Sequence, residues 1–245
     1  MQDKIYGFNP VIEALESGSE IDKILLKDGI KHSKASKITA LAKEKKIPFQ
    51  FVNQSKLDTL TEGGNHQGVL AFSAVHKYYT VDEILESAAE KNEPPFIVIL
   101  DSVTDPHNLG SIIRTANAAG AHGVIIPKNR SAGLSSTVFK VSAGASEYTM
   151  VAKVTNLSRT VEDLKKKGVW VAGTALEAES YHFDTDLKGP LAVIIGSEGE
   201  GMSRILREKC DFLVKIPMLG RIESLNASVA AGILLYEAVR QRIKQ

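Results

Sequence analysis

The chain has 245 residues, 43% of them hydrophobic and 24% charged, which fits one large or two modest globular domains. Its 30 basic and 29 acidic residues nearly balance, which argues mildly against a nucleic-acid partner. No apolar run approaches the ~20 residues of a membrane-spanning helix, and the first residues lack the order of a signal peptide, so we expect a cytoplasmic protein without a membrane partner. One cysteine, Cys210, excludes an intramolecular disulfide and a cysteine-based zinc site, and the six histidines show no metal-ligand spacing, so no metal is expected.

Strand and helix signals alternate over residues 1–75. The pair Asn9-Pro10 predicts a helix through Leu15, because a cap residue precedes a proline at the first helical position. The remaining apolar and amphipathic segments predict strands at 23–27, 48–52 and 68–75, and helices at 33–46 and 54–61. We therefore expect a small α/β sandwich domain over residues 1–75.

Residues 76–95 differ in composition, with one short amphipathic helix, a net acidic charge and a Pro-Pro pair, and are interpreted as a linker. From residue 96 onward, continuous apolar runs are typical of parallel strands covered on both faces; they lie at 96–100, 123–127, 149–152, 169–173, 191–196 and 212–217. Helices fit between these runs. The last helix is predicted from residue 224 to about 243, with an apolar side formed by Leu225, Val229, Ile233 and Tyr236. These signals predict an α/β domain over residues 96–245.

Unusual polar sequence follows three of these strands, at the sheet edge where open parallel sheets bind ligands. After strand 96–100 come Asp101 and Asp105, then Asn108 as the expected helix N-cap, and Arg114 one turn into the helix. A guanidinium there suits a phosphate or an oxyanion. An ion pair between Arg114 and one of the two aspartates is an equally weighted alternative.

The second and third polar segments are weaker signals when each is taken alone. Residues 195–202 form a glycine-rich turn whose Glu198 and Glu200 would repel pyrophosphate and whose spacing matches no nucleotide motif, so a cationic or neutral ligand is preferred. The alternative is a structural turn whose acids complement the helix dipole. In the third segment, Ser224 and Asn226 open the last helix, which is also the pattern of ordinary helix capping.

Together and in this order, the three segments resemble the motifs of the SpoU (TrmH) family of RNA ribose 2′-O-methyltransferases, in the SPOUT class. The matching stretches are DPHNLGSIIRTANAAGA, IIGSEGEGM and IPMLGRIESLNASVAAGI. Near the N-terminus, YGFNPVIEAL and HQGVLAF are similar to the L30e-like substrate-binding domain of the branch that methylates guanosine in 23S ribosomal RNA. Ala227 and Leu219 depart from the usual residues of the third motif by apolar exchanges.

The resemblance implies a C-terminal α/β domain with a deep trefoil knot, a rare exception to the rule against threaded chains. It implies S-adenosylmethionine as cofactor, whose sulfonium charge agrees with the acidic glycine loop. By the family pattern, the backbones of Gly196, Ile216 and Leu225 hold the cofactor, with Thr174 nearby. It also implies a homodimer with an active site shared between subunits, for which the apolar last helix is a plausible face.

Arg114 is the central catalytic residue that the resemblance implies, supported by Asn108, Glu198, Ser224 and Asn226. A guanidinium holds its proton firmly, so our hypothesis is that Arg114 binds the adjacent phosphate and stabilises the developing alkoxide. The proton of the ribose hydroxyl then passes to a phosphate oxygen, to water or to Glu198.

RNA capture is assigned to the predicted helix 33–46, because Lys31, Lys34 and Lys37 recur every third residue and Lys43, Lys45 and Lys46 follow, so that one side of the helix is basic. A solvated lysine face is the alternative. A ribose 2′-hydroxyl as target makes RNA the substrate and excludes DNA.

The leading interpretation is thus a 23S ribosomal RNA guanosine 2′-O-methyltransferase. The alternatives are a transfer-RNA or other ribosomal-RNA ribose methyltransferase, an inactive RNA-binding assembly factor, and a dinucleotide-dependent enzyme, which the missing glycine fingerprint disfavours.

Overall fold

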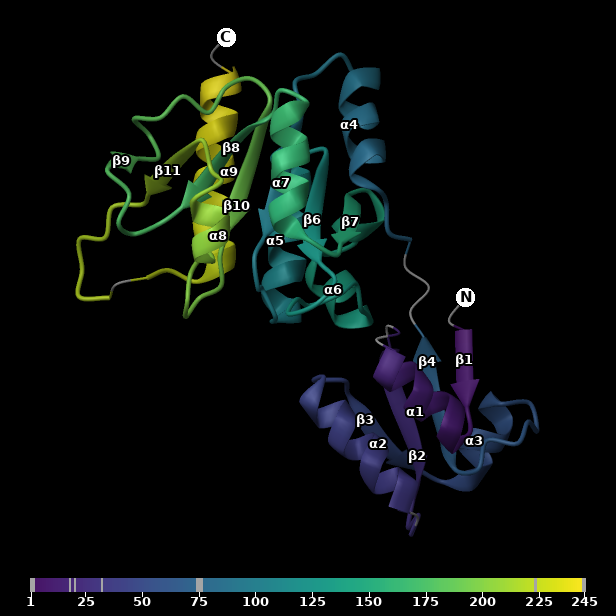
Figure 1. The fold of residues 1–245 in the computed structure, drawn as a ribbon. Coiled ribbons are helices and arrows are strands. Elements are labelled where there is room, and N and C mark those ends of the chain that lie inside the picture. Colours follow the sequence, from purple (N-terminus) through teal and green to yellow (C-terminus); the bar gives the residue numbers. More distant parts are fainter. Residues whose placement is uncertain are drawn as a thin grey trace. The chain divides into compact units, whose positions relative to one another are not determined.

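The computed structural model describes residues 3–17, 19, 21–31, 33–73, 77–222 and 224–243 (Figure 1). The chain divides into two compact units, one of Met1–His76 with Leu134–Ser136 and one of Lys77–Gly133 with Thr137–Gln245. Each unit has its own sheet, and each is described by itself. Within the described ranges, none of the helices combines the length and apolar character that crossing a bilayer requires.

The first unit is a four-stranded sheet with helices on both faces. Strand order is β1-β4-β2-β3, with β2 and β3 parallel and the other pairs antiparallel. The strands are β1 (Asp3–Tyr6), β2 (Ile21–Lys27), β3 (Phe49–Val52) and β4 (Val69–Ser73), and the helices are α1 (Phe8–Ser17), α2 (Ser33–Glu44) and α3 (Gln54–Leu60). Because side chains alternate along a strand, Ile24 and Leu26 pack under α1 and α2, whereas Leu25 packs under α3.

This unit matches the expected sandwich, with differences at its edges. Strand β1 is absent from the sequence prediction, because its four residues include polar Asp3 and Lys4 and it lies at the sheet edge, where burial imposes less apolar pattern. The last two positions of the strand predicted at 68–75 lie outside the described residues.

The second unit is built on a sheet of seven parallel strands in the described part of the chain. Their order is β7-β6-β5-β10-β8-β11-β9. The strands are β5 (Phe96–Leu100), β6 (Gly123–Pro127), β7 (Met150–Val154), β8 (Trp170–Thr174), β9 (Ser180–Tyr181), β10 (Leu191–Ile195) and β11 (Phe212–Lys215). Every residue of β5 and of β10 is buried, as continuous apolar runs in a sheet covered on both faces require.

Helices cover both faces of this sheet (Figure 1). They are α4 (Val81–Glu90), α5 (Pro106–Ala118), α6 (Ser136–Val141), the 3-10 helix η1 (Ala145–Glu147), α7 (Leu157–Lys166), α8 (Arg204–Arg207) and α9 (Ala227–Ile243). Helices α4, α7 and α8 share one core cluster with the sheet, while α9 packs against α5 and β10.

Most of the segment interpreted as a linker belongs to this second unit. Ile84 of α4 is fully buried in the same core cluster as β5, and a Cβ added to Gly123 would lie 2.5 Å from the Ile84 Cδ1 atom. The Tyr79 N–H donates to the Val151 carbonyl at 2.9 Å. The composition of residues 76–95 did not reveal that α4 packs on the sheet. The helix is amphipathic, and the acidic residues of its solvent face outnumber its few buried apolar residues.

Two helix starts differ from the sequence prediction. Helix α5 is capped by Asp105, whose Oδ1 accepts from the His107 N–H at 2.8 Å, so Asn108 lies inside the helix and is not its cap. Helix α9 begins at Ala227 and not at residue 224, because Asn226 Oδ1 accepts from the Ser228 N–H at 2.9 Å. In both cases a second polar residue close by carried the same capping signal.

The end of α9 is bonded to the connection between β9 and β10. Gln241 donates to the Thr185 carbonyl at 3.0 Å and accepts from the Leu187 N–H at 2.9 Å, and Arg242 donates to the Gly189 carbonyl at 2.6 Å. Helix α9 contacts β10 as well. The end of the C-terminal helix is therefore anchored to an earlier connection of the same unit.

Glu237→Gln is expected to lower the urea midpoint of the second unit at neutral pH. Hydrogen bonds from Arg240 and from Gln241 lower the pKa of Glu237 from 4.5 to about 2. A carboxyl group whose pKa falls on folding adds stability that is complete above its unfolded pKa and disappears as pH falls through its folded pKa. The difference between wild type and variant should therefore shrink from pH 4.5 toward pH 2, as followed by the fluorescence of Trp170, the only tryptophan.

Glu90→Gln is the control, since Glu90 is an exposed carboxylate of α4 without a partner among the described residues. A Glu237→Gln effect that stays constant with pH would contradict the assigned role of the carboxylate.

Candidate active site

The carboxyl ends of β5, β10, β8 and β11 lie side by side, because β10 is inserted between β5 and β8. The buried carboxylate of Asp101, directly after β5, joins two of these ends. Its Oδ2 accepts from the Ser203 N–H at 2.7 Å, and its Oδ1 accepts from the Ser102 hydroxyl at 3.1 Å. Asp101 thereby fixes the far end of the glycine-rich loop to the strand that precedes the first motif.

The glycine-rich loop after β10 folds back on itself. Ser197 and Gly201 exchange two backbone hydrogen bonds of 3.0 Å. A Cβ atom on Gly196 would lie 2.2 Å from the Gly201 carbonyl carbon and 2.3 Å from the Met202 nitrogen. Glycine is thus required at 196 for the loop to close over the strand end.

Three polar side chains, one from each motif, form a closed ring of hydrogen bonds. Asn108 donates to Glu198 Oε1 at 2.9 Å and accepts at its Oδ1 from the Asn226 amide at 2.9 Å. Asn226 also donates to Glu198 Oε1. Three of the five predicted catalytic residues are therefore in direct contact.

The other two predicted catalytic residues are exposed. Arg114 has no hydrogen bond or ion pair within the described residues, and its proposed structural partners are used elsewhere, Asp101 by Ser203 and Asp105 by His107. Ser224 lies in the wall of a cavity between the motif loops. The guanidinium of Arg114 is thus available for a ligand.

This cavity has a volume of about 280 Å³, and every residue that was predicted to hold a cofactor lies in its wall. The predicted residues in its wall are Thr174, Gly196, Ile216 and Leu225. Their assignment to a cofactor stays a prediction. Glu198 and Ser224 line the same cavity, so predicted binding and catalytic residues share one space.

Charged residues that sequence reasoning missed also line this cavity. Glu177 follows β8, Arg207 ends α8 and Lys215 ends β11. Arg207 Nη1 donates to Glu177 Oε1, and the pKa of Glu177 is lowered, first by its own backbone N–H and then by Arg207. The position of Glu177 and Lys215 at strand ends was the available signal, but the contact of α8 with the loop after β8 is not visible in the sequence.

With Glu198 and Glu200, the described residues of the wall carry three carboxylates against two cations. Its remaining surface is largely apolar, from side chains that include Leu176, Met202 and Met218. A flat apolar group and a positive charge would both be accommodated.

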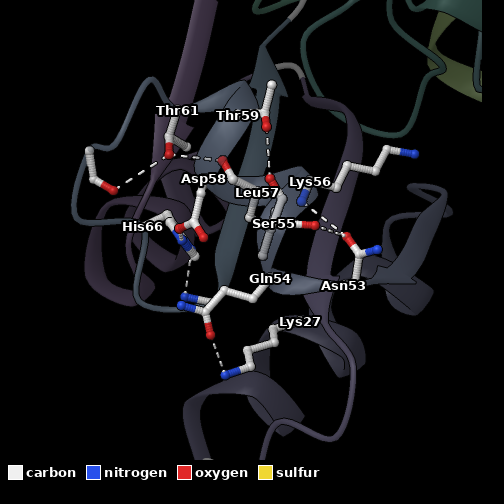
Figure 2. A network of polar contacts seen from close by, with 12 residues as sticks. Lys27, Asn53, Gln54, Ser55, Lys56, Leu57, Asp58, Thr59, Thr61 and His66 are labelled. Atoms are coloured by element: carbon white, nitrogen blue, oxygen red, sulfur yellow. Dashed lines mark hydrogen bonds and ion pairs between the residues drawn. The ribbon is translucent and has the colours of Figure 1, made fainter.

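A second cavity, of about 610 Å³, lies in the first unit and is lined by Lys27, Lys31, Gln54, Asp58 and His66, among others. Figure 2 shows its polar network, in which Lys27 donates to Gln54 Oε1 at 2.7 Å and His66 Nε2 lies 2.8 Å from Asp58 Oδ1. The Gly68 N–H donates to His66 Nδ1 at 2.9 Å, so Nε2 carries the proton and donates to Asp58. The loop that forms this wall is therefore fixed from two sides.

The three lysines predicted for RNA capture do not form one free face. Lys34 donates to Asn9 at 2.6 Å, and Lys37 pairs with Glu16 at 2.6 Å, so both are engaged with α1. Lys31 instead lines the second cavity. Lys31 precedes α2, so the spacing of three does not place all three lysines on one side of that helix, and the side that carries Lys34 and Lys37 lies beside α1.

Residues 95–236 match the SpoU rRNA methylase family, and residues 4–79 match the RNA 2′-O ribose methyltransferase substrate-binding domain. The chain belongs to the SpoU family of RNA methyltransferases. A Bacillus subtilis relative, named as the TrmH family tRNA/rRNA methyltransferase YacO, is 50% identical over 240 residues, which are 98% of this chain and 96% of the relative. The resemblance inferred from the motifs is confirmed.

Solved structures confirm the expected α/β fold class. The SpoU methyltransferase AviRb from Streptomyces viridochromogenes, in complex with AdoMet, is 27% identical with a TM-score of 0.64, over 100% of this chain and 92% of AviRb. An AdoMet-bound rRNA methyltransferase from Sinorhizobium meliloti is 28% identical with a TM-score of 0.59, over 98% and 87%. A TrmH/SpoU tRNA modifying enzyme from A. aeolicus is 32% identical with a TM-score of 0.58, over 62% of this chain and 77% of its own.

Gly196→Ala is expected to destabilise the second unit by about 1–3 kcal/mol, the usual effect of overpacking, because its methyl group would collide with the backbone of Gly201 and Met202. Gly199→Ala is the matched control in the same loop, since a Cβ there meets nothing within 4 Å. Urea unfolding followed by Trp170 fluorescence measures both variants. Equal effects of the two substitutions would contradict the required close approach at Gly196.

Proposed function

We propose that this protein uses S-adenosylmethionine to methylate a ribose 2′-hydroxyl in RNA in the cytoplasm, and that the target is a guanosine of 23S ribosomal RNA. The observation that carries the proposal is the ring of Asn108, Glu198 and Asn226, one residue from each motif, with Glu198 in the cavity wall. An inactive assembly factor would have no need for this ring.

The cavity fits the proposed cofactor by the chemistry of its wall. Apolar side chains suit the adenine ring, and Glu198 and Glu200 suit a positive sulfonium. Arg207 Nε is buried and has no hydrogen-bond partner in the described part of the chain, so it is an unused donor beside the same space. When bound, the cofactor supplies an electrophilic methyl group on sulfur. Thr174, Gly196, Ile216 and Leu225 would hold it.

The side chains of the ring prepare the hydroxyl for attack. A ribose hydroxyl is a poor nucleophile, so the site must align it and accept its proton. Both amides bond to Glu198 Oε1, which leaves Oε2 without a hydrogen bond among the described residues and free to accept from the hydroxyl, directly or through one water. Arg114, which has no partner among the described residues, binds the adjacent phosphate and stabilises the developing alkoxide.

Ribosomal RNA is favoured over transfer RNA by the extent of the similar proteins. The S. meliloti structure described as an rRNA methyltransferase covers 98% of this chain, whereas the A. aeolicus tRNA modifying enzyme covers 62%. The substrate-binding domain at residues 4–79 accounts for much of that difference in length. Transfer RNA is the second candidate, since YacO is named for both substrates.

The first unit contacts RNA, in this proposal, through the cavity beside the polar network drawn in Figure 2 and not through an open lysine face on α2. Lys27 and Lys31 contribute two positive charges to its wall, and the paired His66 and Asp58 hold the loop beside them. Lys37 is already paired with the carboxylate of Glu16, whereas Lys27 is bonded to the neutral amide of Gln54 and keeps its charge for a phosphate. The cations of the cavity are therefore the better partners for phosphate.

We also propose a homodimer through the second unit. Helix α9 has half-exposed apolar side chains at Val229 and Tyr236, and Ile243 is 76% exposed. A stable dimer interface usually buries such a row of side chains.

The wild-type protein, given methyl-labelled cofactor and RNA from a strain that lacks the gene, should label one guanosine ribose in 23S RNA, as mapped by mass spectrometry. Arg114→Lys is expected to lower the rate about 100-fold, typical for loss of a transition-state contact, and to leave cofactor affinity unchanged.

Arg159→Lys, at an exposed arginine of α7, is the control. Label in transfer RNA alone would contradict the ribosomal assignment, and near wild-type turnover of Arg114→Lys without a steeper pH dependence would contradict the role of its guanidinium.

The double variant Lys27→Gln/Lys31→Gln should weaken binding of the mapped 23S fragment about tenfold. The slope of log affinity against log salt concentration should fall by the equivalent of about one to two phosphate contacts. Lys43→Gln with Lys45→Gln removes the same charge elsewhere in the unit and should have little effect. Filter binding at several KCl concentrations measures both pairs. An equal loss in the two double variants would mean that only net charge matters.

A further inference from the structure

The wall of the active-site cavity contains an ion pair that none of the three motifs includes. Arg207 ends α8 and donates from Nη1 to Oε1 of Glu177, which follows β8. Both residues line the cavity. Their side chains are 36% and 58% exposed, so the pair is open to the cavity and is not a sealed structural bridge.

The hydrogen-bonding capacity of Arg207 is only partly used by this pair. A guanidinium has five N–H donors in a planar fork. Nη1 is bonded to Glu177, and Nε is buried, so a ligand in the cavity cannot reach it. Nη2 has no hydrogen bond among the described residues and is not sealed off, so it is the donor left for a ligand, with the second N–H of Nη1 beside it.

The two charges of the pair are complementary to a zwitterion. S-adenosylmethionine ends in an α-amino acid, which carries one carboxylate and one ammonium group close together. We propose that Arg207 binds this carboxylate and Glu177 binds this ammonium, so that the pair forms the subsite for the amino-acid end of the cofactor. The inference rests on the proposed cofactor and goes beyond it, because it assigns two further residues to one part of that molecule.

Lys215 is the competing cation in the same wall. Its ammonium lies 5.1 Å from the ring centroid of Tyr181, and within the described residues it has no ion pair. A lysine offers a point charge, whereas the fork of Arg207 matches both oxygens of a carboxylate. The geometry therefore favours Arg207.

The test compares two ligands that differ only in the amino-acid end. S-adenosylhomocysteine and 5′-methylthioadenosine share the adenosine and a neutral thioether, and only the first carries the zwitterion. Calorimetry on the full-length protein should show that Arg207→Gln weakens S-adenosylhomocysteine about tenfold, as expected for a lost charge-assisted bond, and changes 5′-methylthioadenosine less than about twofold. Glu177→Gln should likewise weaken S-adenosylhomocysteine more than 5′-methylthioadenosine.

Two further variants keep the result interpretable. Arg207→Lys retains the charge without the fork and should give an intermediate, still selective loss, and Lys215→Gln should weaken both ligands equally or not at all. Equal weakening of the two ligands by Arg207→Gln, or a selective loss in Lys215→Gln instead, would overturn the subsite. Failure of the wild type to bind either ligand or the cofactor would instead overturn the proposed function itself.

Discussion

The position of strand β10 between β5 and β8 is the constraint on which the second unit depends. Because all strands of this sheet run parallel, inserting β10 there brings the carboxyl ends of β5, β10, β8 and β11 to one edge. Segments separated by about a hundred residues then meet, as in the bond between Asn108 and Asn226. The site is thus a consequence of strand order, and each motif contributes only one part of it.

The glycine-rich loop after β10 must lie close against the strand end and be held rigidly, because otherwise Glu198 would not stay within reach of the two amides. Gly196 permits the close approach, since any Cβ would collide with Gly201, and Asp101 holds the far end of the loop through the Ser203 N–H. Glu198, between these two anchors, is then held in place for the amides of the ring. A buried carboxylate bonded to a backbone N–H is well suited to this purpose, because the charge strengthens the bond.

Apolar continuity made the central strands of the second unit predictable, since strands buried on both faces must be apolar throughout. The edge strand β9, only Ser180–Tyr181, has no such requirement and escaped prediction, as did β1 in the first unit. The segment that carries Glu198 could be found from its position after a buried strand, and the role of Glu198 was predicted from the resemblance of that segment to a family motif. Arg207 could not, because its partner Glu177 lies 30 residues away on a loop whose packing against α8 is purely tertiary.

The net charge of the chain was also a poor guide to its binding partners, because it does not show where the charges lie. The near balance of 30 basic and 29 acidic residues averages over sites of opposite sign. Among the described residues, the cavity of the second unit carries three carboxylates and two cations, whereas Lys27 and Lys31 add positive charge to the cavity of the first. The sulfonium and the phosphate backbone of the proposed function call for these opposite environments within one chain. Because screening confines each field to about 8 Å at physiological salt, a ligand in either cavity responds to the charges of that cavity and not to the net charge of the chain.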